Sequence, residues 1–329
     1  MRVLIIKLTS MGDLMHAFPA LTDAQQRIPG ISFDWVVDES FAEVPQWHPA
    51  VHNVITTAHR RWKKNLVRSW REGEFNDFYQ QLNHDDYDLV IDLQSNLKSA
   101  FVSWLRRGPI HGYDKHTCRE KPAHWTYAKQ YSIPLRQHAI ERQRALFAQI
   151  FDYDCPETPS DYGVDLSQYA LPTYSQAKLS LPEKYVVLVH NASWPTKLWP
   201  VESWQALIEK VSALGYSILL PCGSEAEYTR AQSIVQHSPM AIALEKMGLQ
   251  GMAAIMSHAQ AAVCSDTGLA HMAAVASTPA ITLYAVTDTV LIGTLGKNQQ
   301  HIIARDGQAD ACMGDISVDT VWKKLQDLL

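Results

Sequence analysis

Two series of strand-length apolar segments, each alternating with helical segments, constrain the fold of this chain most strongly. The predicted strands are Val3–Leu8, Phe33–Val37, Leu89–Ile91, Tyr185–Val189, Ile218–Leu220, Ala261–Cys264 and Ala280–Tyr284. The predicted helices are Asp13–Ile28, Phe75–Leu82, His138–Ile150, Ser203–Leu214, Glu225–Val235 and Val318–Leu328. Because strands that alternate with amphipathic helices form parallel βαβ units, the sequence predicts an α/β protein with doubly wound sheets.

A proline-rich segment interrupts this alternation. It contains Pro156, Pro159, Pro172 and Pro182, and the alternation resumes at Tyr185. A chain of 329 residues is also long for one hydrophobic core. The sequence therefore predicts two Rossmann-like domains facing a central cleft, residues 1–160 and 185–329, with a linker at 161–184. The last predicted helix is a candidate to pack back on the first domain.

Composition excludes several classes of protein. Hydrophobic residues make up 47% and charged residues 19%, which is typical of a folded globular protein. Five scattered cysteines with no C-x-x-C spacing favour a reducing, cytoplasmic location over a disulfide framework or a zinc site. No window approaches 18 uninterrupted apolar residues, so no transmembrane helix is expected, while a peripheral membrane contact remains open.

The first predicted strand runs into Thr9-Ser10-Met11-Gly12-Asp13 and then a helix. A dinucleotide fingerprint would require G-x-G-x-x-G at this turn, and its absence argues against a nicotinamide or flavin enzyme. Asp13 has two interpretations. Aspartate commonly caps a helix, but a carboxylate at the end of the first strand also faces the ligand crevice and can act as a base. The residues alone leave both open.

Two loops of the second domain are candidate anion sites. Ser265-Asp266-Thr267-Gly268 lies between a strand and a helix, where backbone N–H groups and the helix dipole attract anions. Asp266 as a helix cap and His271 as an interior histidine are equally plausible interpretations. Lys197, in the loop after Tyr185–Val189, can neutralise a phosphate or lie solvated.

The segment Arg60–Arg71 is basic and aromatic, with six Lys or Arg residues and no acid. A nucleic-acid site, a solvated helix face and a site for fixed phosphates all fit this pattern. The formal net charge of -5 argues against nucleic acid as a partner, so phosphates on a small or lipid-linked ligand fit better. No cluster of carboxylates that would hold a metal follows a strand, because Asp85-Asp86-Tyr87-Asp88 precedes one and is expected to be a solvated turn.

Taken together, these segments resemble the ADP-heptose glycosyltransferase family, and within it the heptosyltransferase I type of lipopolysaccharide core synthesis. The matching segments span nearly the whole chain in the same order: residues 1–21, Phe33–Val37, Arg60–Lys64, Lys197–Pro200, Ser265–His271 and Thr287–Gln299. The resemblance implies a GT-B fold and an inverting, metal-independent glycosyltransferase. Its reaction would transfer L-glycero-D-manno-heptose from ADP-heptose to a Kdo hydroxyl of Kdo-modified lipid A.

The resemblance also implies roles for individual residues. Asp13 would be the catalytic base, and no cofactor or metal would be needed. Donor-binding residues would be Ser193, Lys197, Glu227, Met247, Asp266, Thr267, Gly268 and His271. Acceptor-binding residues would be Ser10, Gly12, Arg60, Arg61, Lys64 and Arg119. The first domain would bind the acceptor and the second ADP-heptose, at the cytoplasmic face of the inner membrane.

Three alternatives stay open on the sequence. They are a heptosyltransferase II type of enzyme, a nucleotide-sugar epimerase on the same scaffold, and a non-catalytic nucleotide-sugar-binding protein. One departure from the family pattern concerns the leaving diphosphate. Ala192-Ser193 stands where members often carry a Thr pair, which would remove one hydroxyl donor.

Overall fold

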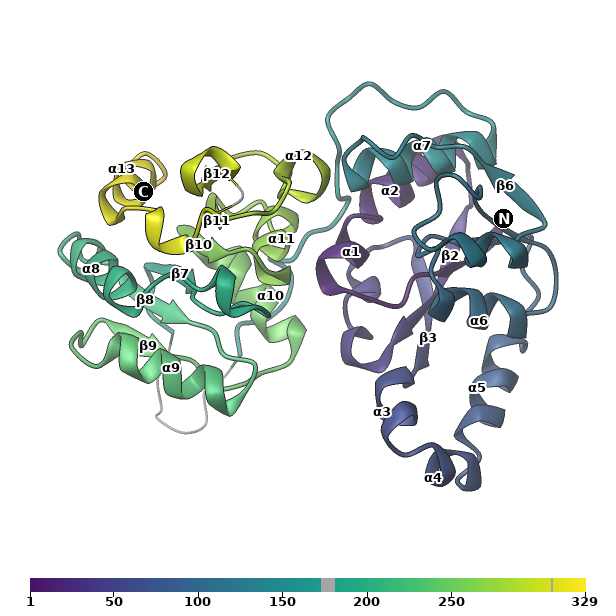
Figure 1. The fold of residues 1–329 in the computed structure, drawn as a ribbon, viewed down its shortest axis with the longest axis horizontal. Coiled ribbons are helices and arrows are strands. Elements are labelled where there is room, and N and C mark those ends of the chain that lie inside the picture. The colour runs from purple at the N-terminus through teal and green to yellow at the C-terminus, as the bar shows by residue number, and fades with distance from the viewer. Residues whose placement is uncertain (173–180, 309) are drawn as a thin grey trace. The chain divides into compact units, whose positions relative to one another are not determined.

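The computed structural model describes residues 1–172, 181–308 and 310–329, and the chain divides into two units, Met1–Val164 and Asp165–Leu329 (Figure 1). Each unit contains one six-stranded parallel sheet with helices packed on it. The unit boundary falls inside the segment 161–184 that the sequence assigns to the linker. Residues 173–180 of that segment lie outside the described residues.

In the first unit the strand order is β3-β2-β1-β4-β5-β6. The strands are β1 (Arg2–Ile6), β2 (Ser32–Asp38), β3 (Val51–Thr57), β4 (Leu89–Asp92), β5 (Ile110–Tyr113) and β6 (Lys129–Tyr131). The α-helices are α1 (Met11–Met15), α2 (Phe18–Arg27), α3 (His59–Lys64), α4 (Leu66–Arg71), α5 (Glu74–Leu82), α6 (Leu97–Leu105) and α7 (Ala139–Phe151). Short 3-10 turns are η1 (Glu39–Phe41), η2 (Pro45–Trp47) and η3 (Lys121–Thr126).

In the second unit the order is β12-β11-β10-β7-β8-β9. The strands are β7 (Tyr185–Val189), β8 (Ser217–Leu220), β9 (Ala241–Ala243), β10 (Ala261–Ser265), β11 (Ala280–Tyr284) and β12 (Gln299–Ile303). The α-helices are α8 (Val201–Ser212), α9 (Glu225–Val235), α10 (Leu249–His258), α11 (Gly268–Val275), α12 (Thr289–Ile292) and α13 (Val318–Gln326). The 3-10 turns are η4 (Pro195–Lys197), η5 (Ala304–Gly307) and η6 (Met313–Asp315).

Both sheets have the same doubly wound topology, confirming the predicted fold class. In each, the first strand of the unit lies in the middle and the chain first winds outward in one direction, then in the other. The strand order therefore reverses between β1 and β4 and between β7 and β10. In open parallel sheets the crevice at this reversal, at the carboxyl ends of the strands, is where ligands bind.

The apolar segments form the centres of the two sheets. Strands β1, β7 and β10 are almost completely buried, as expected for parallel strands covered by helices on both faces. In the second unit the core extends to Val321 and Leu325 of α13, which packs against α8 and β11. The last helix thus has its packing partners within its own unit.

The structure corrects the prediction of one helix over Asp13–Ile28. That segment forms two helices, α1 and α2, separated at His16 and Ala17. Pro19 lies in the first turn of α2. Proline has no N–H to donate to the carbonyl four residues earlier and its ring clashes there, so a continuous helix cannot pass through this position.

Two ion-pair clusters hold segments of the first unit together. Arg144 of α7 is almost fully buried and donates to Asp23 of α2, with Nε 2.7 Å from Oδ2. Arg2 of β1 binds the buried Asp34 at 2.7 Å and Asp85 at 2.8 Å. Asp86 and Asp88 are exposed, as expected for a solvated turn, and Asp85 in addition helps to fix the start of β1.

Candidate active site

In the first unit, Asp13 lies at the reversal between β1 and β4. Ser10 is the N-cap of α1 and Asp13 occupies the third position of that helix. The Ser10 N–H and hydroxyl donate to Asp13 Oδ2 at 3.1 and 3.0 Å, and Arg119 Nη1 is 4.0 Å from the same oxygen. The side chain is 34% exposed. Asp13 therefore takes part in helix capping and still presents a carboxylate at the crevice, so both interpretations of the sequence apply.

The loop that carries Asp13 is fixed by the loop after β4. Gln94 Oε1 accepts hydrogen bonds from the backbone N–H groups of Leu8 and Thr9, at 2.6 and 3.1 Å. Asp92 shapes the Gln94 loop in turn, because its Oδ1 accepts from the N–H groups of Gln94 and Ser95, each at 2.9 Å. Burial raises the pKa of the Asp92 carboxyl, and these N–H donors oppose that shift.

Lys7 is a cation beside this carboxylate that the sequence prediction missed. It follows β1 directly, is 6% exposed, and its Nζ donates to the Leu93 carbonyl at 3.3 Å. Burial lowers the pKa of the Lys7 ammonium to about 8, and the Asp13 carboxylate opposes this shift most strongly. A lysine interrupting an apolar strand was the signal for it in the sequence.

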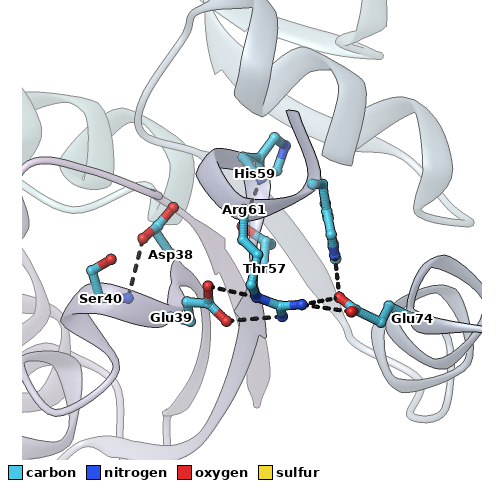
Figure 2. Close-up of polar contacts among 8 residues, drawn as sticks. Asp38, Glu39, Ser40, Thr57, His59, Arg61 and Glu74 are labelled. Atoms are coloured by element: carbon cyan, nitrogen blue, oxygen red, sulfur yellow. Dashed lines mark hydrogen bonds and ion pairs between the residues drawn. The ribbon is translucent and has the colours of Figure 1, made fainter. Parts of the chain in front are cut away.

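The three basic residues predicted on Arg60–Lys64 have different environments. Figure 2 shows Arg61 of α3 between Glu39 and Glu74. Its Nε and Nη2 donate to Glu39, each at 3.1 Å, and its Nη1 donates to both Glu74 oxygens at 2.5 and 2.6 Å. Arg60 lies over the Phe41 ring, 5.8 Å from its centroid. Lys64 lines a surface groove along α3 and α4.

Arg61 is thus the least available of the three for a ligand. Four of its five N–H donors are used, and they tie α3 to η1 and to α5. By contrast, the groove at Lys64 contains further cations, Lys63, Arg68 and Arg71. Glu72 also lines it and pairs with Arg68. The groove therefore offers cations to an anion, whereas the Arg61 guanidinium is already engaged by two carboxylates.

In the second unit, an ion pair marks the reversal between β7 and β10. Lys197, in the loop after β7, contacts Asp266 directly after β10, with 2.5 Å between Nζ and Oδ2. The Thr287 hydroxyl, after β11, donates to the same Asp266 oxygen at 2.6 Å. The carboxylate therefore holds the lysine over the carboxyl edge of the sheet.

The helix α11 begins beside this pair. Its N-cap is Thr267, so the interpretation of Asp266 as the cap is wrong. The Thr267 hydroxyl oxygen is buried and has no hydrogen-bond partner within the part of the chain that the structure describes. Gly268 is the first residue of the helix, and His271 lies one turn further in and is buried. A helix N-terminus with an unused hydroxyl and a nearby lysine is suited to an anion.

The remaining predicted donor residues lie at the same edge of the second sheet. Glu227, in the first turn of α9 after β8, accepts from the Gly223 N–H at 2.7 Å and from Asn191 Nδ2 at 3.0 Å. Met247 follows β9, and a Cβ added to Gly251 in the first turn of α10 would lie 3.5 Å from its sulfur. Ser193 is exposed on the loop that carries Lys197.

The sequence prediction missed two residues in the second unit. Asn191 orients Glu227, and Thr287 orients Asp266. Both lie in loops that follow apolar strands, and a position after a strand is the signal that drew attention to Asp13 and Asp266. Across the described ranges of the chain, no group of three or more His, Cys, Asp or Glu side chains is arranged to hold a metal ion.

This geometry can be compared with known proteins. Residues 76–320 match the family model of glycosyltransferase family 9 (heptosyltransferase). Lipopolysaccharide heptosyltransferase 1 of Pseudomonas aeruginosa is 45% identical over 303 residues, covering 92% of this chain and 83% of that protein.

Two solved structures of the Escherichia coli heptosyltransferase WaaC have the same fold over the full length of both chains. The complex with ADP superimposes with a TM-score of 0.91 at 39% identity. The complex with ADP-2-deoxy-2-fluoro heptose superimposes with a TM-score of 0.88 at 38% identity. Because the family model matches most of the chain and these relatives are 38–45% identical to it, the chain belongs to glycosyltransferase family 9, the heptosyltransferases. It is a glycosyltransferase with the GT-B fold.

Proposed function

We propose that this chain is a lipopolysaccharide heptosyltransferase of type I. It transfers L-glycero-D-manno-heptose from ADP-heptose to a Kdo hydroxyl of Kdo-modified lipid A in inner-core synthesis. The observation that carries this proposal is the Lys197–Asp266 pair beside the N-terminus of α11, at the reversal point of the second sheet. The similar Escherichia coli enzyme has been solved with ADP and with an ADP-heptose analogue, which supports ADP-heptose as the donor.

The second unit would bind the donor. Lys197, the Thr267 hydroxyl and the first N–H groups of α11 would neutralise the diphosphate, while Asp266 faces the heptose. Glu227 and Met247 would contact the ribose and adenine, because they follow β8 and β9, further along the same edge. Ser193 and His271 complete the proposed donor set.

Asp13 would act as the general base. It removes the proton from the acceptor hydroxyl as that oxygen attacks C1 of the heptose. The bond between C1 and the ADP oxygen breaks on the opposite face, its electron pair leaves with ADP, and the configuration at C1 inverts. The charge that develops on ADP would be met by Lys197 and the α11 dipole. We therefore propose that the reaction needs no metal and no cofactor.

The first unit would bind the acceptor. Ser10, Gly12 and Arg119 lie around Asp13, and the groove at Lys64 offers cations for phosphates or Kdo carboxylates. Arg60 would help to form this surface, and Arg61 would support it by fixing α3 through Glu39 and Glu74. We place the enzyme at the cytoplasmic face of the inner membrane, where this acceptor is embedded. No helix in the part of the chain described is long and apolar enough to cross a bilayer.

The first prediction concerns Asp13→Asn, assayed as ADP release from ADP-heptose with and without delipidated Kdo-lipid A. The amide keeps the shape of the carboxylate but accepts no proton, so kcat should fall by ~10²-fold or more with ADP affinity unchanged. Ser317→Ala, at the N-cap of α13, is the control, because it removes one capping hydrogen bond and leaves Asp13 and the acceptor residues unchanged. Equal losses in the two variants would mean that Asp13 acts only as a cap.

The same assay separates the alternative functions. An epimerase would convert ADP-heptose without acceptor, and a non-catalytic binding protein would bind ADP without transfer in any acceptor mixture. Either result would overturn the proposed function.

The second prediction concerns Lys197→Ala in buffer containing EDTA. Wild-type activity should persist in EDTA, because Lys197 and α11 supply the positive charge. The variant should raise the KM for ADP-heptose by about ten-fold or more and leave the acceptor KM nearly unchanged. Lys210→Ala, on the surface of α8, is the matched control and should change neither. Loss of wild-type activity in EDTA with rescue by Mg²⁺ would contradict the assignment.

The third prediction is a pH dependence set by Lys7. Burial lowers the pKa of the Lys7 ammonium to about 8, so Lys7 loses its positive charge beside Asp13 around that pH. The wild-type kcat/KM profile should therefore contain a step near pH 8, and Lys7→Met, whose side chain does not titrate, should lack this step. Lys129→Met, at an exposed lysine of the same unit, is the control and should keep the step. Superimposable profiles for Lys7→Met and wild type would exclude this role.

A further inference from the structure

The helix α6 has an unusual outward face. Its inner face packs in the core of the first unit through Ala100 and Val102. Its outer face carries Leu97, Phe101 and Trp104, which are 57%, 45% and 72% exposed. Their spacing of four and three residues places them in one stripe. A helix that faces solvent on one side normally carries charged or polar residues on that side. The outer side of α6 carries this apolar stripe instead.

The neighbouring turn also carries an exposed aromatic side chain. The 3-10 turn η3 packs against α6 and carries Trp125, which is 78% exposed. Within α6, the ring centroids of Phe101 and Trp104 lie 6.2 Å apart. Three exposed aromatic side chains and a leucine thus occur on two packed elements, here called the α6–η3 face. Single exposed apolar residues are common on protein surfaces, but several large ones on two packed elements indicate an interaction site.

Basic residues surround this face. Lys98, Arg107 and Lys121 are exposed on or next to α6 and η3. From residue 98 to 136 the chain has eight basic residues, Lys98, Arg106, Arg107, Lys115, Arg119, Lys121, Lys129 and Arg136. The acidic residues in the same range are Asp114 and Glu120. The Glu120 carboxylate accepts a hydrogen bond from the Leu97 N–H at 2.9 Å. The partner of this face should therefore be apolar and carry negative charge.

We propose that the α6–η3 face docks this chain on the surface of an anionic bilayer. Tryptophan and phenylalanine side chains insert readily at the boundary between headgroups and acyl chains, because their rings are amphipathic or apolar and rigid. Lys98, Arg107 and Lys121 then meet the lipid phosphates. Apolar insertion combined with attraction to anionic lipid is the physical basis of reversible surface binding by peripheral proteins.

The residues of this docking surface differ from those of the proposed sugar-transfer site. None of its four apolar residues belongs to the proposed donor or acceptor set. The other exposed apolar-basic segment, α4, lines the groove assigned to the acceptor and is not part of the docking face. Binding to vesicles that contain no Kdo-lipid A thus tests the docking face alone.

The experiment is co-sedimentation with phosphatidylglycerol-containing vesicles and with pure phosphatidylcholine vesicles. Wild-type protein should bind the anionic vesicles preferentially, and salt should weaken the binding. The double variant Phe101→Gln, Trp104→Gln should lower the partition coefficient by about ten-fold or more, since it removes two inserting rings. Trp194→Gln, at a tryptophan of the second unit that is 66% exposed, is the matched control and should bind as wild type does. Lys98→Gln, Lys121→Gln should flatten the salt dependence.

Three results would overturn the proposal. The first is that the wild-type protein does not bind anionic vesicles, and the second is that the Phe101, Trp104 variant binds them as well as the wild type does. The third is that the wild type is a dimer and the variant a monomer. The last would show that the face contacts a second copy of the chain. The double variant should also transfer heptose to delipidated acceptor at the wild-type rate. A failure of vesicle binding would therefore leave the proposed transfer reaction standing, and a failure of transfer would leave the docking result standing.

Discussion

In each sheet, parallel hydrogen bonding places the carboxyl ends of all six strands at one edge, and the reversal of strand order opens a gap in the covering helices there. The polar groups of the site depend on this constraint. Asp13 follows β1 and the Gln94 loop follows β4, on the two sides of one reversal. Lys197 follows β7 and Asp266 follows β10, on the two sides of the other. Without the reversals, helices would cover these positions.

The two sites have complementary chemistry. In the first unit the Asp13 carboxylate lies at the crevice near the buried Lys7 ammonium and Arg119. In the second unit a carboxylate holds a lysine beside a helix N-terminus, which favours a bound anion. A base and a stabilised leaving group are the two requirements of inverting sugar transfer, and in the proposed reaction each unit would supply one of them.

The central part of the fold was predictable from the sequence, and the edges were not. Strands β1, β2, β4, β7, β8, β10 and β11 are apolar because helices cover both of their faces. The missed strands β3, β5, β6, β9 and β12 lie at or next to the sheet edges, where exposed residues such as His52 and Lys129 break the apolar run. Helix α6 was missed because its outer stripe is apolar, so the amphipathic period is lost. The same irregularity underlies the proposed membrane contact.

Within the site, the sequence located residues by their position after strands and by resemblance. It did not reveal which side chains form ion pairs or hydrogen bonds with one another. It grouped Arg60, Arg61 and Lys64 as one cationic patch. The structure shows that Arg61 is engaged by Glu39 and Glu74, which are 22 and 13 residues away in the chain. Lys7 and Thr287 follow apolar strands, but their roles depend on interactions with Asp13 and Asp266 across loops, which the sequence pattern does not reveal.

The central claim is that the carboxyl edge of the second sheet binds the nucleotide, and backbone hydrogen exchange with and without ADP tests it most directly. Amides that hydrogen-bond the diphosphate, or that become buried by it, exchange more slowly. ADP should slow exchange in residues 190–200, 222–228 and 265–270 and leave residues 7–15 of the first unit nearly unchanged. Slowed exchange in residues 7–15 with none in 265–270 would contradict the account.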